Sequence, residues 1–199
     1  MIASVLKLSR SDCKAIGLKD VYGLHKIIYS LFPEIPGQKR DFLFADKGGG
    51  FNSRKILILS EREPIPPEYG VLSSKPVPDQ FLAHNIYGFE IVLNPTKRNP
   101  ETGKIVSVRK KDDLLEWFTQ RCEKHGFDVL SQSLQVNVLG VLRYEKNGKH
   151  CTHNTATFMG KLRVTDREAF IQSFKQGIGR AKAFGFGLLQ IVPIDNMTY

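Results

Sequence analysis

The chain has 199 residues, of which 41% are hydrophobic, and its 29 Lys and Arg against 20 Asp and Glu give a formal net charge of +9 at pH 7. This hydrophobic fraction is enough for a buried core and excludes a disordered chain, while the length allows one large domain or two small ones. The positive charge favours nucleic acid or another polyanion as partner, because cationic side chains neutralise phosphates and release counterions; a basic surface without a partner is the alternative.

The cysteines and the hydropathy of the sequence indicate the compartment in which the protein resides. Cys13, Cys122 and Cys151 are odd in number and far apart, which predicts neither a disulfide framework nor a metal knuckle. The N-terminal segment MIASVLKLSRSDCK alternates like a strand and lacks the features of a signal peptide. No apolar run approaches the roughly 20 residues that span a bilayer. The sequence therefore predicts a soluble, cytoplasmic protein with no membrane partner.

The first half of the chain combines one helix with several strands. Asp20 can cap a helix from about Val21 to Phe32, which Pro33 would end. Half of the ten prolines fall within residues 64–78 and predict an irregular connection. Strand patterns occur at residues 2–8, 41–46, 55–60 and from Tyr87 onward. This order is typical of a ferredoxin-like or RRM-like half, and we assign it to residues 1–98.

The second half, residues 99–199, repeats this order of elements. Two helices are predicted from capping boxes, Asp113 with Glu116 and Thr165 with Glu168. Residues 136–145 and 156–164 predict an antiparallel hairpin around a polar tip, and residues 188–192 a closing strand. We therefore predict an α+β fold of two tandem ferredoxin-like (RRM-like) domains.

A glycine-rich loop lies between the last predicted helix and the last strand, in the sequence GIGRAKAFGFGLLQIV. Gly177, Gly179, Gly185 and Gly187 surround Arg180 and Lys182. Glycines allow positive φ, and backbone N–H groups beside two cations suit a phosphate. The loop leaves a helix and enters a strand, which disfavours a Rossmann dinucleotide site. A helix C-cap followed by a packing loop is the alternative, and the residues alone leave both open.

His25 is the histidine best placed for chemistry. On the predicted helix it forms a stripe with Tyr22 and Tyr29 at the edge of the core face. A histidine can transfer a proton near neutral pH, and a phenol can hydrogen-bond a hydroxyl or a phosphate oxygen. RNA carries its own nucleophile, the 2′-OH, so strand scission needs only alignment, proton transfer and charge stabilisation. A partly buried structural histidine is the alternative interpretation of His25.

The other histidines suggest no site. His84 and His125 are interpreted as solvated or facing a helix dipole. His150, Cys151 and His153 crowd the predicted hairpin tip, where their spacing matches no common zinc pattern and favours an exposed turn. The sequence contains no HExxH, P-loop, nucleophile elbow or paired carboxylates, so we expect no metal and no cofactor.

The segment GIGRAKAFGFGLL resembles the glycine-rich signature of CRISPR repeat-RNA processing endoribonucleases, and in its details the CasE (Cse3) family of type I-E systems. YGLHKIIYSLFP, FEIVLNPTKR and GKLRVTDREAFIQSFKQGIG share the resemblance, which covers nearly the whole chain. It implies two ferredoxin-like folds, a CRISPR repeat RNA stem-loop as ligand, and metal-independent cleavage of precursor crRNA at the 3′ base of the hairpin. The products would be a 2′,3′-cyclic phosphate and a 5′-hydroxyl. It also implies retention of the crRNA within the Cascade complex, with other Cascade subunits as partners.

The resemblance assigns the active-site histidine to His25 and a nearby tyrosine to Tyr22. We predict in addition that a nearby cation such as Lys26 or Arg40 stabilises the developing phosphorane charge. Between residues 97 and 111 six cations stand against one acid, Glu101, and would supply a basic groove. The residues predicted to bind RNA are Lys26, Lys39, Arg40, Lys97, Arg98, Lys104, Arg109, Lys110, Lys111, Lys146, Lys149, Lys161, Arg163, Gly179, Arg180 and Lys182. Two rival functions stay open: a non-catalytic RNA-binding module, and a metabolic enzyme whose glycine loop holds a phosphate ligand.

Overall fold

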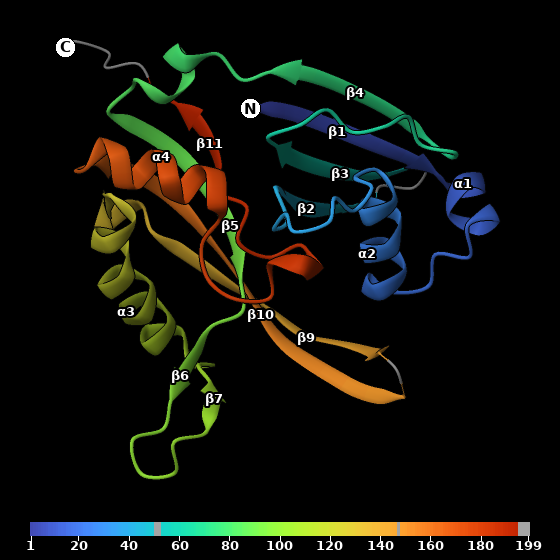
Figure 1. Ribbon diagram of the computed structural model, residues 1–199. Helices are drawn as coiled ribbons and strands as arrows, with labels where there is room; N and C mark the ends of the chain where they lie inside the picture. The colour runs from blue at the N-terminus through green and yellow to red at the C-terminus, as the bar shows by residue number, and fades with distance from the viewer. Residues whose placement is uncertain (50–52, 147, 195–199) are drawn as a thin grey trace.

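The computed structural model describes residues 1–49, 53–146 and 148–194, apart from the side chains of Val138, Leu139, Lys146 and Lys149. These residues form a four-stranded sheet, a five-stranded sheet and a two-stranded hairpin, with helices packed on the two larger sheets (Figure 1). No helix within the described residues is both long and apolar enough to cross a membrane.

The first sheet has the strand order of a ferredoxin-like fold. Its strands are β1 (Ile2–Ser9), β2 (Phe42–Gly49), β3 (Ser53–Ser60) and β4 (Val71–Pro76). They lie in the order β2-β3-β1-β4, and every neighbouring pair is antiparallel. Two helices, α1 (Arg10–Ala15) and α2 (Val21–Ser30), follow β1.

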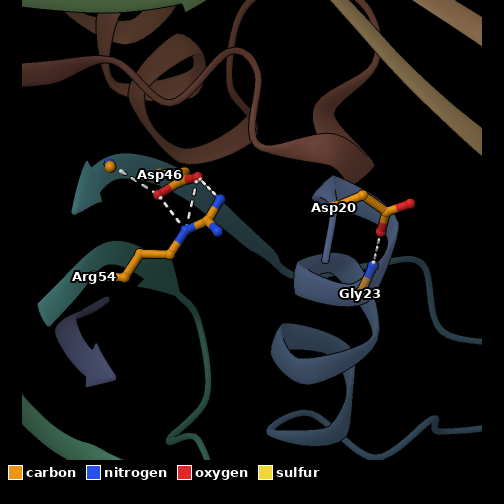
Figure 2. A network of polar contacts seen from close by, with 5 residues as sticks. Asp20, Gly23, Asp46 and Arg54 are labelled. Atoms are coloured by element: carbon orange, nitrogen blue, oxygen red, sulfur yellow. Dashed lines mark hydrogen bonds and ion pairs between the residues drawn. The ribbon is translucent and has the colours of Figure 1, made fainter. Parts of the chain in front are cut away.

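Helix α2 begins where the sequence predicts it. The Asp20 carboxylate accepts a hydrogen bond of 2.8 Å from the Gly23 N–H, as Figure 2 shows, which confirms the predicted cap. Leu24 and Ile28 are fully buried against the first sheet, and this burial fixes the rotation of α2. Figure 2 also shows the ion pair of Arg54 with Asp46, which joins β2 to β3 where their register shifts.

The second sheet has the equivalent strand order. Its strands are β5 (Ile86–Leu93), β8 (Phe127–Val129), β9 (Gln135–Lys146), β10 (Lys149–Val164) and β11 (Gln190–Pro193). They lie in the order β11-β5-β10-β8, and β9 also pairs with β10. One helix, α3 (Lys111–Cys122), lies between β5 and β8 along the chain, and another, α4 (Arg167–Gln176), lies between β10 and β11. The small hairpin consists of β6 (Thr96–Arg98) and β7 (Ile105–Ser107). The predicted α+β fold of two tandem ferredoxin-like domains is confirmed.

One hydrophobic core joins the two sheets. Leu43, Ala45 and Leu59 of the first sheet belong to the same buried cluster as β5, β10, α3 and α4. Within it the Phe118 ring stacks on Phe158 with centroids 4.4 Å apart. Because the first sheet buries residues on both faces, the two domains are held together by apolar contact.

The strand from Tyr87 was expected in the first half, and this expectation is wrong. That segment is β5, which pairs with β10 and β11 in the second sheet. The fourth strand of the first sheet is instead β4, inside the proline-rich segment 64–78. It is an edge strand that pairs with β1 alone, a place where proline at a strand end is tolerated. We propose that the domain boundary lies in residues 77–85, ahead of β5, and not between residues 98 and 99.

Two predicted capping boxes are also wrong. Helix α3 begins at Lys111, two residues before Asp113, and its N-cap makes no side-chain hydrogen bond. The N-cap of α4 is Asp166, which accepts a hydrogen bond from the Ala169 N–H at 3.0 Å, and not Thr165. In each helix an acidic residue of the first turn, such as Asp113 or Glu168, still suits the positive end of the helix dipole.

The polar tip predicted between β9 and β10 is mostly strand. The two strands pair as far as Lys146 opposite Lys149, so His150, Cys151 and His153 lie within β10 and not in an exposed turn. The Asn-Gly dipeptide at positions 147–148 is typical of a two-residue hairpin loop. This hairpin extends beyond the sheet, and β9 contacts α2 (Figure 1).

Candidate active site and nucleic-acid interface

Helix α2 holds an aromatic stripe around His25. The His25 ring stacks on Tyr22 with centroids 5.7 Å apart and tilts against Tyr29 at 4.0 Å. The three residues are half-buried, because the buried face of α2 is set by Leu24 and Ile28. His25 therefore lies at the rim of the helix and is not sealed in the core.

The glycine loop fixes the orientation of the His25 ring. The Ala183 carbonyl lies 2.8 Å from His25 Nδ1, and Phe184 contacts the ring at 5.3 Å between centroids. A carbonyl oxygen only accepts hydrogen bonds, so Nδ1 carries the hydrogen and Nε2 of the neutral ring is the basic atom. The same hydrogen bond stabilises the imidazolium when Nε2 is protonated.

The long hairpin adds Tyr144 to this cluster. Its ring lies 6.2 Å from Tyr22 and 4.4 Å from Phe184 between centroids. Its hydroxyl lies 3.0 Å from His153 Nε2. Burial, followed by the charge of Cys151 and a hydrogen bond to it, raises the pKa of Tyr144 to about 12, so the phenol stays protonated at neutral pH.

His153 is the second histidine of the cluster. Its Nδ1 lies 3.1 Å from the Asn94 side-chain nitrogen, which donates, so Nε2 carries the hydrogen and donates to Tyr144. Burial lowers the pKa of His153, which favours this neutral form. The ring also contacts Phe184 at 5.7 Å.

Sequence reasoning missed Tyr144 and Phe184 and interpreted His153 as part of an exposed turn. The Asn-Gly dipeptide was the signal that could have located Tyr144 and His153, because it predicts a two-residue loop and thereby the register of the two strands. That register brings His153 opposite Leu142, beside Tyr144. No local pattern marks Phe184, because its contacts come from α2 and β9, far away in the sequence.

The glycine loop is mainly a packing loop. A Cβ on Gly187 would lie 2.3 Å from the Ile178 carbonyl oxygen, and one on Gly177 would lie 2.8 Å from a Leu43 methyl group. The N–H of Gly187 donates to the Val92 carbonyl, and the N–H of Ile178 donates to the Gly187 carbonyl. These two N–H groups are therefore used within the protein and do not point at a phosphate. The packing interpretation therefore holds for this part of the loop, which carries the carbonyl that orients His25.

Two exposed residues remain in the glycine loop. Gly179 and Arg180 face solvent on the stretch before Ala181. Lys182, in contrast, donates to the carbonyls of Gln176 at 2.8 Å and Gly177 at 3.1 Å, so its ammonium group ties the loop to the end of α4.

A cationic hollow of about 370 Å³ lies beside the histidine. Its lining has four cations, Lys39, Arg40, Lys175 and Lys182, against two acids, Asp41 and Glu61. It also includes Tyr29, which contacts His25. Burial, and then the charge of Arg40, lowers the pKa of Lys182, which indicates that cations from the two domains lie close together. On the other side of the stripe, Lys26 Nζ lies 4.8 Å from the centroid of the Tyr22 ring.

The remaining predicted cations are not all gathered at His25. Three of these cations, Lys97, Arg98 and Arg180, line a second hollow in the second domain, together with Gly179. Four further cations are exposed. Lys104 lies on the turn between β6 and β7, and Arg109, Lys110 and Lys111 lie at the start of α3 or just before it.

Lys161 and Arg163 lie at the opposite end of β10, and Lys161 is roughly 26 Å of strand from His153. The side chains of Lys146 and Lys149 lie outside the described part of the chain. The participation of all these cations in RNA binding stays a prediction.

The three remaining histidines differ in their exposure and contacts. His125 was expected to be solvated or to face a helix dipole. It is half-buried, and its Nδ1 lies 2.9 Å from the Ser173 hydroxyl. Burial, and then neighbouring cations, lower its pKa to about 4. His84 lies edge-on to Tyr87 at 6.0 Å, and His150 is exposed on β10. In the part of the chain that the structure describes, no three His, Cys, Asp or Glu side chains are grouped to hold a metal ion.

Comparison with known proteins identifies the family. A family model described as "CRISPR associated protein" matches residues 2–193. This chain belongs to that family. It is 28% identical over 193 residues to the "CRISPR system Cascade subunit CasE" of Escherichia coli K12, which covers 88% of this chain and 94% of that protein. It is 34% identical over 115 residues to the "CRISPR-associated endoribonuclease Cse3" of Thermus thermophilus, covering 53% of this chain and about half, 54%, of that relative.

Solved structures of the family share the fold. The structure described as "CRISPR endoribonuclease Cse3 bound to 19 nt RNA" superposes with a TM-score of 0.84 over 97% of this chain and 100% of that one, at 23% identity. The Cas6e protein of Escherichia coli K-12 superposes with a TM-score of 0.75 over 98% of this chain and 100% of that one, at 25% identity. The likeness extends across both ferredoxin-like domains.

Proposed function

We propose that this chain is an endoribonuclease that binds the stem-loop of a CRISPR repeat RNA and cleaves precursor crRNA at the 3′ base of the hairpin. The family match over residues 2–193 and the names of the two relatives support this function. The observation that carries it is the position of His25, at the rim of α2 and oriented by Ala183, beside cations from both domains. A cationic surface suits the phosphates, and A-form shape is what proteins read in an RNA stem.

We further propose that cleavage needs no metal ion, because the RNA 2′-OH is the nucleophile. The 2′-oxygen attacks the adjacent phosphorus, the bond from phosphorus to the 5′-oxygen breaks, and the products are a 2′,3′-cyclic phosphate and a 5′-hydroxyl. One proton leaves the 2′-oxygen and one is delivered to the 5′-oxygen. His25 Nε2 handles one of these two transfers as general base or general acid. Its Nδ1–H, held by the Ala183 carbonyl, keeps the ring in this orientation throughout.

The neighbours of His25 supply the other requirements. Tyr22 is proposed to position the 2′-OH or a phosphate oxygen from its place one helical turn earlier on α2. Lys26 on α2 or Arg40 in the cationic hollow is proposed to stabilise the negative charge of the phosphorane. Tyr144 and His153 pack behind Tyr22 and Phe184, and we propose that they hold this aromatic stripe in place.

The test is incubation of a repeat-RNA hairpin with the protein in excess chelator. Cleavage with a 2′,3′-cyclic phosphate end supports the mechanism, and a 2′-deoxy substitution at the nucleotide before the cleavage site must abolish it. Cleavage of the 2′-deoxy RNA would rule out the 2′-OH as nucleophile. RNA binding without cleavage would favour a non-catalytic RNA-binding module, and failure to bind RNA would contradict the proposal as a whole.

The likeness to a Cascade subunit extends the proposal to assembly. The relative that aligns with 88% of this chain is named as a subunit of Cascade, and we propose that this chain stays with its crRNA in such a complex. Co-purification of the chain with crRNA and further subunits from cells that express the whole system tests this. A cytoplasmic location stays a prediction.

A further inference from the structure

A hollow of about 410 Å³ in the second domain has the composition of a nucleotide-binding site. It lies between α3, the hairpin β6–β7 and the glycine loop. Its volume falls in the range of about 300–1,000 Å³ that is typical of small-ligand pockets. Apolar side chains, Phe118, Phe127 and Ile178 among them, form part of its lining. Its cations are Lys97, Arg98, Arg121, Lys124 and Arg180, and its described lining residues include no acid.

A stacking platform lies in this lining. The Trp117 indole N–H donates to the Thr96 carbonyl at 2.9 Å, which fixes the ring. The Arg121 guanidinium lies 4.3 Å from the centroid of that ring and donates to the Trp117 carbonyl at 2.7 Å. A guanidinium plane held against an indole offers a surface on which an unpaired nucleobase stacks, whereas bases within a stem are already stacked and paired.

The hollow adjoins the candidate active site through two connections. Asn94 lines the hollow, and its side chain lies 3.1 Å from His153, which shares Phe184 with His25. In the glycine loop, Arg180 lines the hollow and the carbonyl of Ala183 binds His25. Arg180 and Ala183 are three positions apart in the sequence, so their Cα atoms are at most about 11 Å apart. The hollow and the candidate active site therefore share the glycine loop and lie close enough for one RNA strand to contact both.

We propose that this hollow binds one unpaired nucleotide that flanks the stem at the cleavage site. The nucleobase stacks on the Arg121 and Trp117 platform, and its phosphate contacts the cations at the rim, with Arg180 nearest to the active site along the chain. This inference rests on the proposed function, because it needs an RNA strand at His25. The nucleotide comes from the 3′ or the 5′ flank of the hairpin, and the two sources are separated by the experiment.

Trp117 is the one tryptophan of the sequence, so the tryptophan emission of the protein comes from a residue in the lining of this hollow. His25→Ala protein is titrated with labelled hairpins that carry both flanks, or that lack the base of the nucleotide next to the stem on the 3′ or the 5′ side. Anisotropy measures binding, and tryptophan emission measures occupation of the hollow. We expect the intact RNA to change the emission, and one of the two abasic RNAs to lose this change and to bind roughly 5- to 100-fold more weakly.

Variants of two cations provide a matched comparison. Arg121→Gln removes the platform and must bind intact and abasic RNAs with similar affinity. Lys14→Gln removes an exposed charge on α1, outside the hollow and outside the predicted RNA-binding residues, and must keep the difference. If all RNAs bind equally well and change the emission equally, or not at all, the nucleotide site is wrong while RNA binding stands. Absence of binding by anisotropy contradicts the proposed function itself and the nucleotide site with it.

Discussion

Substitution of one glycine in the glycine loop and one outside it separates the free-energy cost of close packing from that of backbone strain. Gly187 has φ of +83°, and a Cβ there would lie 2.3 Å from the Ile178 carbonyl oxygen. Gly103 has φ of +65°, with nothing within 4 Å of a Cβ. Both Gly→Ala substitutions carry the cost of the left-handed conformation, about 1–2 kcal/mol. Gly187→Ala adds an overlap with backbone, which costs about 1–3 kcal/mol more.

Thermal unfolding measures the difference between these two variants. For a chain of this size each kcal/mol lowers Tm by roughly 2–4 °C, so Gly187→Ala is expected to melt roughly 2–12 °C below Gly103→Ala. Its cleavage rate falls as well, because the Ile178–Gly187 pairing holds the loop that orients His25. Equal Tm values for the two variants, with a loss of RNA affinity in Gly187→Ala alone, would refute the packing interpretation and favour a phosphate-binding loop.

Three further predictions follow from the site and its surroundings. Tyr144→Phe leaves the His153 Nε2–H without its acceptor and is expected to cost about 1–3 kcal/mol of unfolding free energy in a urea titration; an unchanged midpoint would contradict the assigned hydrogen bond. His125 has a folded pKa of about 4, below its ordinary 6.5, so it contributes stability above pH 6.5 that is lost as the pH falls toward 4. His125→Gln, which can still bond Ser173, must therefore lose less stability than the wild type between pH 7.5 and pH 5. Lys26→Ala is expected to lower the single-turnover cleavage rate by up to about 100-fold with Tm unchanged, because Lys26 is exposed; a fall in Tm without a fall in rate would assign it a structural role.

The local features of the first helix could be predicted from the sequence. Asp20 caps the helix, and the spacing of Leu24 and Ile28 sets the buried face, which in turn leaves His25 at the rim. These signals act within a few residues, so sequence patterns contain them. The order of strands and helices likewise indicated two ferredoxin-like domains.

Features that depend on distant residues could not be predicted. β5 alternates like any half-buried strand, and nothing in its sequence shows that it pairs with β10 and not with β1. The partners of His153 include Asn94, Tyr144 and Phe184, which come from three separate segments of the chain. The hydrogen bond from the Gly187 N–H to the Val92 carbonyl also depends on tertiary packing. For this reason the sequence alone allowed two interpretations of the glycine loop.

The most direct test of the account is the His25→Ala variant with a repeat-RNA hairpin in chelator. His25 is half-buried at the edge of α2, so its removal leaves the core and the cationic surface intact. We predict a loss of single-turnover cleavage of about 10²- to 10⁴-fold, the usual contribution of a general acid or base, with an unchanged Kd for the RNA. Cleavage at the wild-type rate would contradict the assignment of proton transfer to His25.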